Sequence, residues 1–187
     1  VFRDASVVLL QLETPLKTVQ TAVELAHAAG ARVILNPAPA QTLPRSLLKQ
    51  IYLLTPNENE AELLTGIAVT DEFTAAKAAK RLRTMGVANV VVTMGSRGAY
   101  VESKDFQGML PSYRVKAIDS TAAGDVFNGS LAVALAEGKS LMLAACFAIT
   151  AAAISVTRLG AQISAPTRAE IEHRLTKGKP QPIRAPK

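Results

Sequence analysis

Cysteine is almost absent from this chain of 187 residues, which contains only Cys146. One thiol cannot form a disulfide framework within the chain or a metal site built from several cysteines. This usage fits a reducing compartment, so we expect a cytoplasmic protein. No secretory signal precedes the first strand-like segment. Because the chain runs from Val1 almost directly into that segment, we expect its true start to lie upstream.

Acidic residues are absent from Arg174 onward, where five basic residues occur. This end therefore supplies five units of the formal net charge of +6, and the nearly neutral remainder argues against a nucleic-acid partner. We expect residues 1–175 to form one globular domain, since 49% of the residues are hydrophobic and the length suits a single core. We expect residues 176–187 to form a disordered, basic, Pro-rich tail; a contact with an anionic partner is the alternative.

Charged residues are also absent from Ser140 to Thr157, a stretch long enough to suggest a transmembrane helix. Alanine, serine and threonine dominate it, however, and these residues contribute little to membrane insertion. A helix that is small and apolar on all sides is also typical of a protein core. We favour the buried helix and expect no membrane partner.

The rest of the sequence alternates between strand-like and helical patterns. Continuous apolar runs such as "SVVLLQL" favour strands that are buried on both faces, as in a parallel sheet. In chain order, the patterns predict strand 6–12, helix 16–29, strand 32–36, helix 44–50, strand 51–55, helices 58–66 and 71–84, and strand 89–95. Further on they predict antiparallel strands over 98–103 and 107–115, two long helices that end at Gly160, and a last helix over 167–175.

This order of elements predicts an α/β fold, a three-layer α/β/α sandwich. In open sheets of this kind, ligands bind beyond the carboxyl ends of the strands. Four polar or glycine-bearing stretches are therefore candidates for a functional site.

The first stretch is "TPNENEAE" (55–62), in which Asn57 is in position to cap the helix that follows. Capping alone explains much of this pattern. The functional alternative is that Asn57 and Glu60, one helical turn apart, face one cleft and organise a hydrated Mg²⁺, an ion that keeps several of its waters.

The second stretch is "TMGSRGAY" (93–100), which contains Gly95 and Gly98. The two glycines fit a simple hairpin turn. They also fit a phosphate-binding loop, in which backbone N–H groups approach the phosphate oxygens and Arg97 lies near their charge.

The third stretch is "DSTAAGDVFNGS" (119–130), where small residues precede Asp125. If a helix begins here, the N–H groups of residues 122–125 form an anion-binding nest, reinforced by the helix dipole, for a transferring phosphoryl group. Gly124 permits close backbone approach, and Asp125 is placed to accept a proton from an attacking hydroxyl. A plain helix cap explains Asp125 but not the small residues before it.

The fourth stretch is "SVTRLGAQIS" (155–164), which ends the long apolar helix. Gly160 is suited to a helix C-cap and Arg158 to the last helical turn, so local structure accounts for this pattern.

Together these stretches resemble the ribokinase branch of the PfkB family of carbohydrate kinases. The resemblance covers Val7 to Glu172 and lies in the ordered blocks "NPAPA", "TPNENEAELLTG", "VVVTMGSRGAYV", "VKAIDSTAAGDVFNGSLAVAL" and "AAAISVTRLGAQ". The block "DSTAAGDVFNG" is similar to the family's second signature, D-T-x-A-G-D-x-F-x-G, with Ser120 where threonine is usual.

The resemblance implies an ATP-dependent kinase that phosphorylates the 5-hydroxyl of D-ribose, with Mg²⁺ and K⁺ as further cofactors. It makes Asp125 the general base, Glu60 a water-mediated Mg²⁺ contact and Glu13 a sugar contact. The implied anion hole consists of Ala122, Ala123 and Gly124. The implied ATP contacts are Asn57, Thr93, Met94, Gly95, Ser96, Arg97, Gly98, Gly124 and Asp125. The implied K⁺ site, formed mainly by backbone oxygens, consists of Asp119, Thr121, Ser155, Arg158, Gly160 and Ser164.

Two departures from the family's pattern stand out. Where these kinases commonly have an asparagine near the adenine, this chain has Ile149 in "FAITAAA". Members of the branch also begin with a further segment that supplies sheet strands, a sugar-binding "GG" signature and a β lid that supports dimerisation. The present sequence starts after that segment.

From this second departure we expect an unpaired strand edge and weak or absent activity in the chain alone. A homodimer is expected only for a complete family member. Ribose, deoxyribose, fructose and nucleosides remain possible substrates. A nucleotide-binding fragment without catalysis is the alternative from another class.

Overall fold

The structure, a computed structural model, describes residues 1–178, which divide into two compact units. Unit 1 consists of Val1–Met94 and Tyr100–Met109. Unit 2 consists of Gly95–Ala99 and the chain from Leu110 onward. The expected tail falls mostly on residues 179–187, which lie outside the described part.

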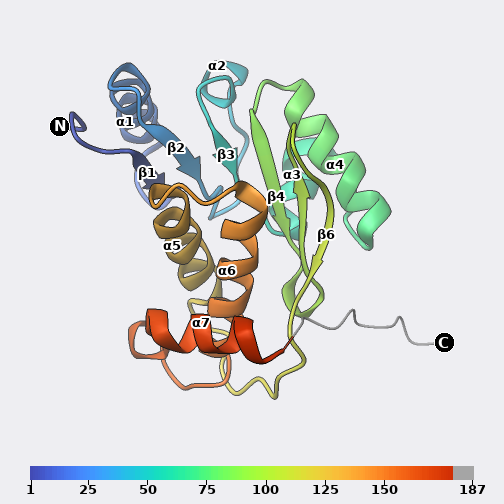
Figure 1. The fold of residues 1–187 in the computed structure, drawn as a ribbon. Helices are drawn as coiled ribbons and strands as arrows, with labels where there is room; N and C mark the ends of the chain where they lie inside the picture. The colour runs from blue at the N-terminus through green and yellow to red at the C-terminus, as the bar shows by residue number, and fades with distance from the viewer. Residues whose placement is uncertain (179–187) are drawn as a thin grey trace. The chain divides into compact units, whose positions relative to one another are not determined.

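Six strands form one sheet in which the spatial order follows the chain order (Figure 1). Their bounds are β1 (Val7–Leu10), β2 (Arg32–Leu35), β3 (Leu53–Leu54), β4 (Asn89–Thr93), β5 (Gly98–Glu102) and β6 (Gln107–Pro111). The α-helices of the described residues are α1 (Leu16–Ala28), α2 (Arg45–Leu48), α3 (Glu58–Thr65), α4 (Glu72–Thr84), α5 (Ala123–Ala136), α6 (Leu141–Ser155) and α7 (Arg168–Lys177). The expected α/β class is confirmed.

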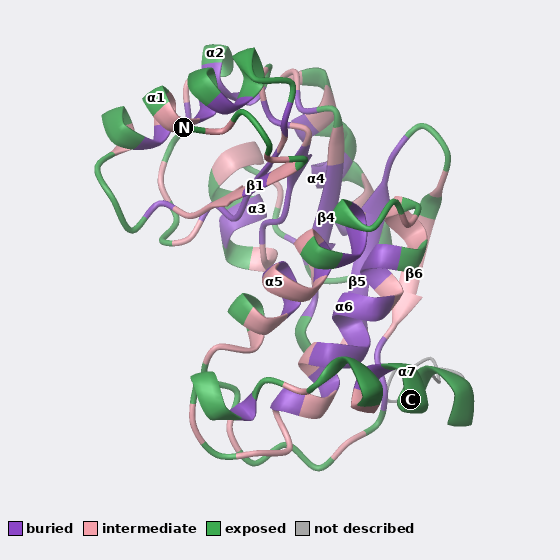
Figure 2. Ribbon diagram, turned by 60° about the vertical axis from the view of Figure 1, so that its left-hand side comes forward, coloured by how far each residue is buried: buried purple, intermediate pink, exposed green. Residues whose placement is uncertain are grey.

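Strands β1 to β4 pair in parallel, as the apolar runs predict. In β4 the side chains of Val90, Val91 and Val92 have no exposed area, and Figure 2 shows this strand as buried. Continuous burial is typical of a parallel strand that is covered on both faces. β1 is the first strand of the sheet and pairs only with β2 among the described residues.

The strands are shorter than the sequence pattern suggests, and β3 is the extreme case. We expected it to span residues 51–55, but its regular ladder covers only two residues. The parallel contacts continue beyond that ladder, because the amide of Tyr52 donates to Val33 O and the amide of Thr55 donates to Leu35 O, both at 3.0 Å. The apolar pattern therefore marks the buried extent of the segment, which exceeds its regular pairing.

The helix ends of unit 1 follow local sequence rules. Asn57 caps the start of α3, and Gly66 ends that helix in the left-handed conformation, with φ of 73°. Asp71 caps the start of α4 through the amide of Thr74. These side chains satisfy amides that would otherwise lack partners at the helix start.

Unit 2 contains α5 and α6, which lie side by side (Figure 1). Both helices contain fully buried alanines, Ala134 in α5 and Ala144 and Ala148 in α6 among them. Within residues 1–178, no helix combines the length and the apolar character needed to cross a bilayer. At its C-terminus, α7 ends at Lys177, two residues beyond the expected end.

Candidate functional site

The predicted site residues form two groups, one in each unit. Unit 1 holds Glu13, Asn57, Glu60, Thr93 and Met94. Unit 2 holds Gly95, Ser96, Arg97, Gly98, Asp119, Thr121, Ala122, Ala123, Gly124, Asp125, Ser155, Arg158, Gly160 and Ser164.

In unit 1, Asn57 and Glu60 form a reciprocal capping box at the start of α3. The Asn57 side-chain oxygen accepts from the amide of Glu60, and the Glu60 carboxylate accepts from both the amide and the side-chain nitrogen of Asn57, all at 2.9 Å. Each residue thus fixes the other's rotamer. The capping role that the sequence predicted is confirmed, and it leaves room for a second role.

Thr93 joins this pair at the end of β4. Asn57 and Thr93 form a parallel bridge, and the amide of Thr93 donates to Pro56 O at 2.9 Å. Glu13 lies elsewhere, exposed in the loop between β1 and α1. Asn57, Glu60 and Thr93 therefore form one compact polar group, to which no described contact joins Glu13.

Glu60 is the buried acid of this group, with 5% of its surface exposed. Burial raises the pKa of its carboxyl, while the hydrogen bond from the Asn57 backbone opposes the shift. A carboxylate offers about four lone-pair positions, and Asn57 occupies two of them. The two remaining positions fit a contact with the water shell of a hydrated Mg²⁺.

The loop after β4 is a short 3₁₀ turn, Gly95–Arg97, that leads directly into β5. Gly98 is required by packing: its φ is 112°, and an added Cβ would lie 2.0 Å from Leu110 O. Gly95 also has positive φ, at 54°, but its missing Cβ would meet nothing within 4 Å. Packing against Leu110 thus accounts for Gly98, whereas only its positive φ accounts for Gly95, which leaves open space over the backbone.

In unit 2, the start of α5 contains a strained residue. Ala122, the N-cap, has φ of 59° and ψ of 11°, and it is the one non-glycine residue with positive φ in the described part of the chain. An L-residue in this region costs about 1–2 kcal/mol. Strain of this kind persists only where the surroundings hold it, and it concentrates at functional sites.

The backbone beside Ala122 presents amides without partners. The amide of Ala123 donates to Ser120 O at 3.2 Å. Fewer amides are therefore available to an anion than the four we predicted. The amides of Ala122 and Gly124 have no partner among the described residues. An added Cβ on Gly124 would meet nothing within 4 Å. No packing contact explains this glycine, whereas close approach of a ligand would.

Asp125 follows in the first turn of α5 and is exposed. Together with Ala122, it lines a cavity of about 580 Å³. Most of the remaining lining is apolar and comes from α5, Phe147 of α6 and the segment 161–171. Amides without a hydrogen-bond partner among the described residues and a carboxylate thus lie at the start of the same helix, beside a cavity.

Asp119 connects the stretch before α5 to the loop after α6. One carboxylate oxygen accepts from the amide of Thr121 and the other from the amide of Gly160, both at 2.9 Å. Hydrogen bonds from the side chain and backbone of Thr121, and then from Gly160, lower the pKa of the Asp119 carboxyl. The carboxylate therefore stays ionised at neutral pH and accepts from both loops.

The residues predicted to hold K⁺ are brought together in part. Asp119, Thr121 and Gly160 are in direct contact, and Arg158 is linked to Ser155 through its amide. Three hydrogen bonds leave about one of the four lone-pair positions of the Asp119 carboxylate, and the hydroxyls of Ser155 and Ser164 donate to backbone carbonyls, which leaves their oxygens able to accept. An oxygen-rich environment of this kind fits a monovalent cation. Within residues 1–178, no cluster of three or more His, Cys, Asp or Glu could hold a metal ion.

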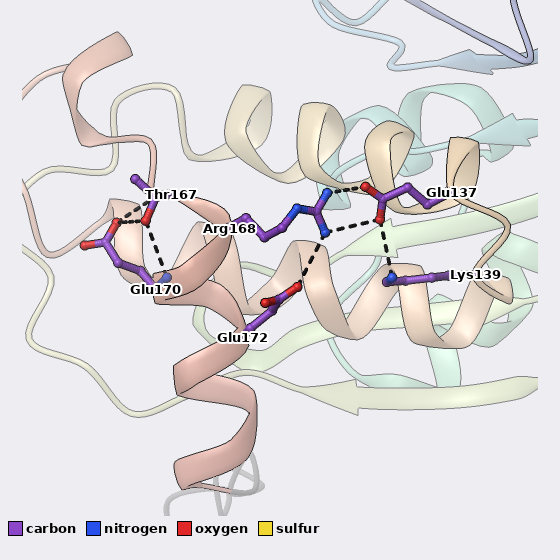
Figure 3. Close-up of polar contacts among 6 residues, drawn as sticks. All are labelled: Glu137, Lys139, Thr167, Arg168, Glu170 and Glu172. Carbon is purple, nitrogen blue, oxygen red and sulfur yellow. Dashed lines mark hydrogen bonds and ion pairs between the residues drawn. The ribbon is translucent and has the colours of Figure 1, made fainter.

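Ion pairs that the sequence analysis missed hold α7 in unit 2. Arg168 pairs with Glu137 at the end of α5 and with Glu172 one turn along α7, and Lys139 also pairs with Glu137 (Figure 3). The Arg168 guanidinium also lies 5.6 Å from the Phe147 ring centroid. These contacts fix one wall of the cavity beside Asp125.

A second connection runs from the loop after α6 to the start of α7. Glu170 closes a capping box with Thr167 (Figure 3) and also pairs with Arg158. The Thr167-x-x-Glu170 spacing is a recognisable helix-start signal, so this box could have been found from the sequence. The long-range partner Arg158 could not.

Comparison with known proteins identifies the family. Residues 2–168 match the family described as pfkB family carbohydrate kinase. The chain belongs to the pfkB family. The expectation drawn from the ordered sequence blocks is therefore confirmed.

Individual family members agree with this assignment. The chain is 50% identical to the ribokinase of Haemophilus influenzae over 162 residues, which cover 87% of this chain and 53% of that protein. A ribokinase structure from Thermotoga maritima matches with a TM-score of 0.83 and 43% identity, covering 92% of this chain and 57% of that one. A ribokinase of Arabidopsis thaliana complexed with ribose and ATP matches with a TM-score of 0.87 and 32% identity, covering 94% and 57%. The expected ribokinase-like fold is thus confirmed, and the chain spans about half the length of these relatives.

The departure at Ile149 also has a place in the fold. Ile149 lies within α6 and is 5% exposed. Its neighbour Thr150 is fully buried and donates to Cys146 O at 2.8 Å. The structure therefore places Ile149 in a buried segment of a pfkB-family helix.

Proposed function

We propose that this chain is the nucleotide-binding and catalytic-base portion of a ribokinase, which transfers the γ-phosphoryl group of ATP to the 5-hydroxyl of D-ribose. The products are ADP and D-ribose 5-phosphate. The observation that carries the proposal is the first turn of α5, where strained Ala122, unobstructed Gly124 and Asp125 lie together.

Each part of this turn has a chemical task in the proposal. The amides of Ala122 and Gly124 donate to the phosphoryl oxygens and stabilise the charge that develops during transfer. Asp125 accepts the proton of the attacking sugar hydroxyl. Family membership and the similarity to ribokinases favour ribose over other sugars.

The remaining contacts follow the same assignment. Asn57 and the loop from Thr93 to Gly98 contact the nucleotide, and Glu13 contacts the sugar. Glu60 holds Mg²⁺ through water, which would neutralise phosphate charge, and the loops around Asp119 and Gly160 hold K⁺, which would raise the positive potential at the nest. We further propose a cytoplasmic location, and a homodimer for the complete protein.

The test uses two forms, because the chain spans about half of its relatives. The first is the chain itself, and the second carries the preceding part of the Haemophilus influenzae ribokinase at its N-terminus. We expect ATP with Mg²⁺ to raise the melting temperature of both forms by several degrees at saturation. We expect ribose phosphorylation from the extended form, with little or none from the chain alone.

The outcomes separate the alternatives. Faster turnover of deoxyribose, fructose or a nucleoside than of ribose would reassign the substrate. ATP binding without transfer to any sugar in the extended form would leave a nucleotide-binding fragment without catalysis. No thermal response to ATP in either form would refute the kinase assignment.

A further inference from the structure

The Asp119 carboxylate is the link between two loops that lie far apart in sequence. Its two oxygens accept from the amides of Thr121 and Gly160, each at 2.9 Å. The same two loops are also joined through Val156 O, which accepts from the amides of Ile118 at 2.7 Å and Asp119 at 3.2 Å. The stretch before α5 is therefore held to the loop after α6 by three hydrogen bonds, while the bond from Thr121 to Asp119 is local to that stretch.

This link acts immediately next to the strained residue. Thr121, which donates to Asp119, directly precedes Ala122 with its φ of 59°. Alanine has no local preference for the left-handed conformation, so its neighbours must hold it there. The carbonyl of Ala122 accepts from the amide of Val126 at 2.9 Å, but that helical bond does not require positive φ at the N-cap. On the other side, the bond from Thr121 to Asp119 fixes the chain that enters Ala122. The bond from the amide of Ala123 to Ser120 O closes the turn around it.

We propose that Asp119 is a positioning residue whose carboxylate holds Ala122 in the left-handed conformation and thereby keeps the amides of Ala122 and Gly124 directed at a bound phosphate. The role of those amides rests on the proposed function. The claim that Asp119 keeps Ala122 in the left-handed conformation does not rest on the proposed function, so the conformation and the phosphate-binding role can be tested separately.

The competing role for Asp119 is that of a cation ligand only. The two roles differ in what a glycine at position 122 does. Glycine adopts positive φ without the steric cost, so Ala122→Gly should make the hold of Asp119 dispensable. It would not replace a lost ligand of a cation.

The experiment compares Asp119→Asn, Ala122→Gly and the double variant, with Asp105→Asn as the control. Asp105 is exposed in the turn between β5 and β6, so its variant removes one negative charge elsewhere. Asparagine keeps the shape of Asp119 but supplies only one acceptor oxygen. Two quantities are measured in each protein: the apparent affinity for ATP with Mg²⁺ and the φ of residue 122 in a crystal structure.

We expect Asp119→Asn to weaken ATP binding about tenfold, which corresponds to about 1.4 kcal/mol. In the A122G background, the same substitution should change the affinity by less than about threefold, roughly 0.65 kcal/mol on the same scale. Asp105→Asn should leave the affinity unchanged. In the crystal structures, Ala122 should leave positive φ in the D119N variant, while residue 122 should keep positive φ in the double variant.

Several results would overturn the inference. One is an Ala122 that keeps φ near 59° in the D119N variant. Another is an equal loss of affinity from D119N in both backgrounds, or a loss that raised K⁺ alone reverses, because either would assign Asp119 to the cation. If D119N does not fold, recovery of folding by A122G supports the proposal and failure to recover contradicts it. If the unaltered protein does not bind ATP, the proposed function fails, and the crystal structures still decide the positioning role.

Discussion

Gly124 offers a substitution that separates the stability of the fold from its function. It lies in the first turn of α5, is exposed, and would bring an added Cβ within 4 Å of nothing. Replacing a helical glycine with alanine gains roughly 0.5–1 kcal/mol when no contact opposes it. For a protein of this size, that gain raises the melting temperature by about 1–4 °C.

The same methyl group would stand where the proposed phosphate approaches the backbone. We therefore expect Gly124→Ala to melt higher than the unaltered chain and to lose most of the stabilisation that ATP with Mg²⁺ provides. Thermal unfolding of the isolated chain, with and without ATP, measures both effects.

His173→Ala is the matched control, because His173 is exposed within α7 and alanine there adds about 0.5 kcal/mol of helix propensity. The control should gain stability and keep the full ATP response. A Gly124→Ala variant that melts lower would show that the position is crowded, and one that keeps the full response would show that phosphate does not approach Gly124.

Two further predictions concern packing and pH. Gly98→Ala should lower the free energy of unfolding, measured with urea, by about 3–5 kcal/mol, because the new Cβ would lie 2.0 Å from Leu110 O at a φ of 112°. Gly30→Ala is the control: Gly30 has positive φ but nothing within 4 Å of an added Cβ, so this variant should lose only about 1–2 kcal/mol. Equal losses in the two variants would refute the steric argument. Hydrogen bonds, first that from the Thr167 backbone, lower the pKa of Glu170 from 4.5 to about 2. Because this pKa is lower in the folded state, the stability that Glu170 contributes is complete above about pH 4.5 and is lost as the pH falls towards 2. Glu170→Gln should remove that part of the acid dependence, and an unchanged stability profile between pH 2 and 4.5 would contradict the assignment.

Local features of the sequence predicted much of the fold and part of the site. The apolar runs located the parallel strands β1 to β4, because strands that are covered on both faces need apolar side chains throughout. Asn57 predicted a helix start, and the predicted helix 58–66 agrees with the observed one, whose C-cap is Gly66, since both ends depend on residues within one turn. These signals are short-range, and the structure agrees with them.

The features that the sequence could not supply are long-range. Asp119 and Gly160 are 41 residues apart; only the resemblance to the family placed them in one site, and no local pattern predicts the hydrogen bond between them. The left-handed Ala122 is invisible for the same reason, since alanine itself prefers the right-handed region. Gly98 looked like an ordinary turn glycine until its distance to Leu110 O was known. The blocks shared with the family located the site, whereas only the fold shows what holds it in shape.

The central claim is that Asp125 is the base of a sugar kinase, and its most direct test is the rate of ribose phosphorylation in the N-terminally extended form with Asp125→Asn. The account predicts a fall of about 10²–10⁴-fold in turnover, with the dissociation constant for ATP within a few-fold of the unaltered value. Turnover that survives the substitution, or ATP binding that is lost together with turnover, would contradict it.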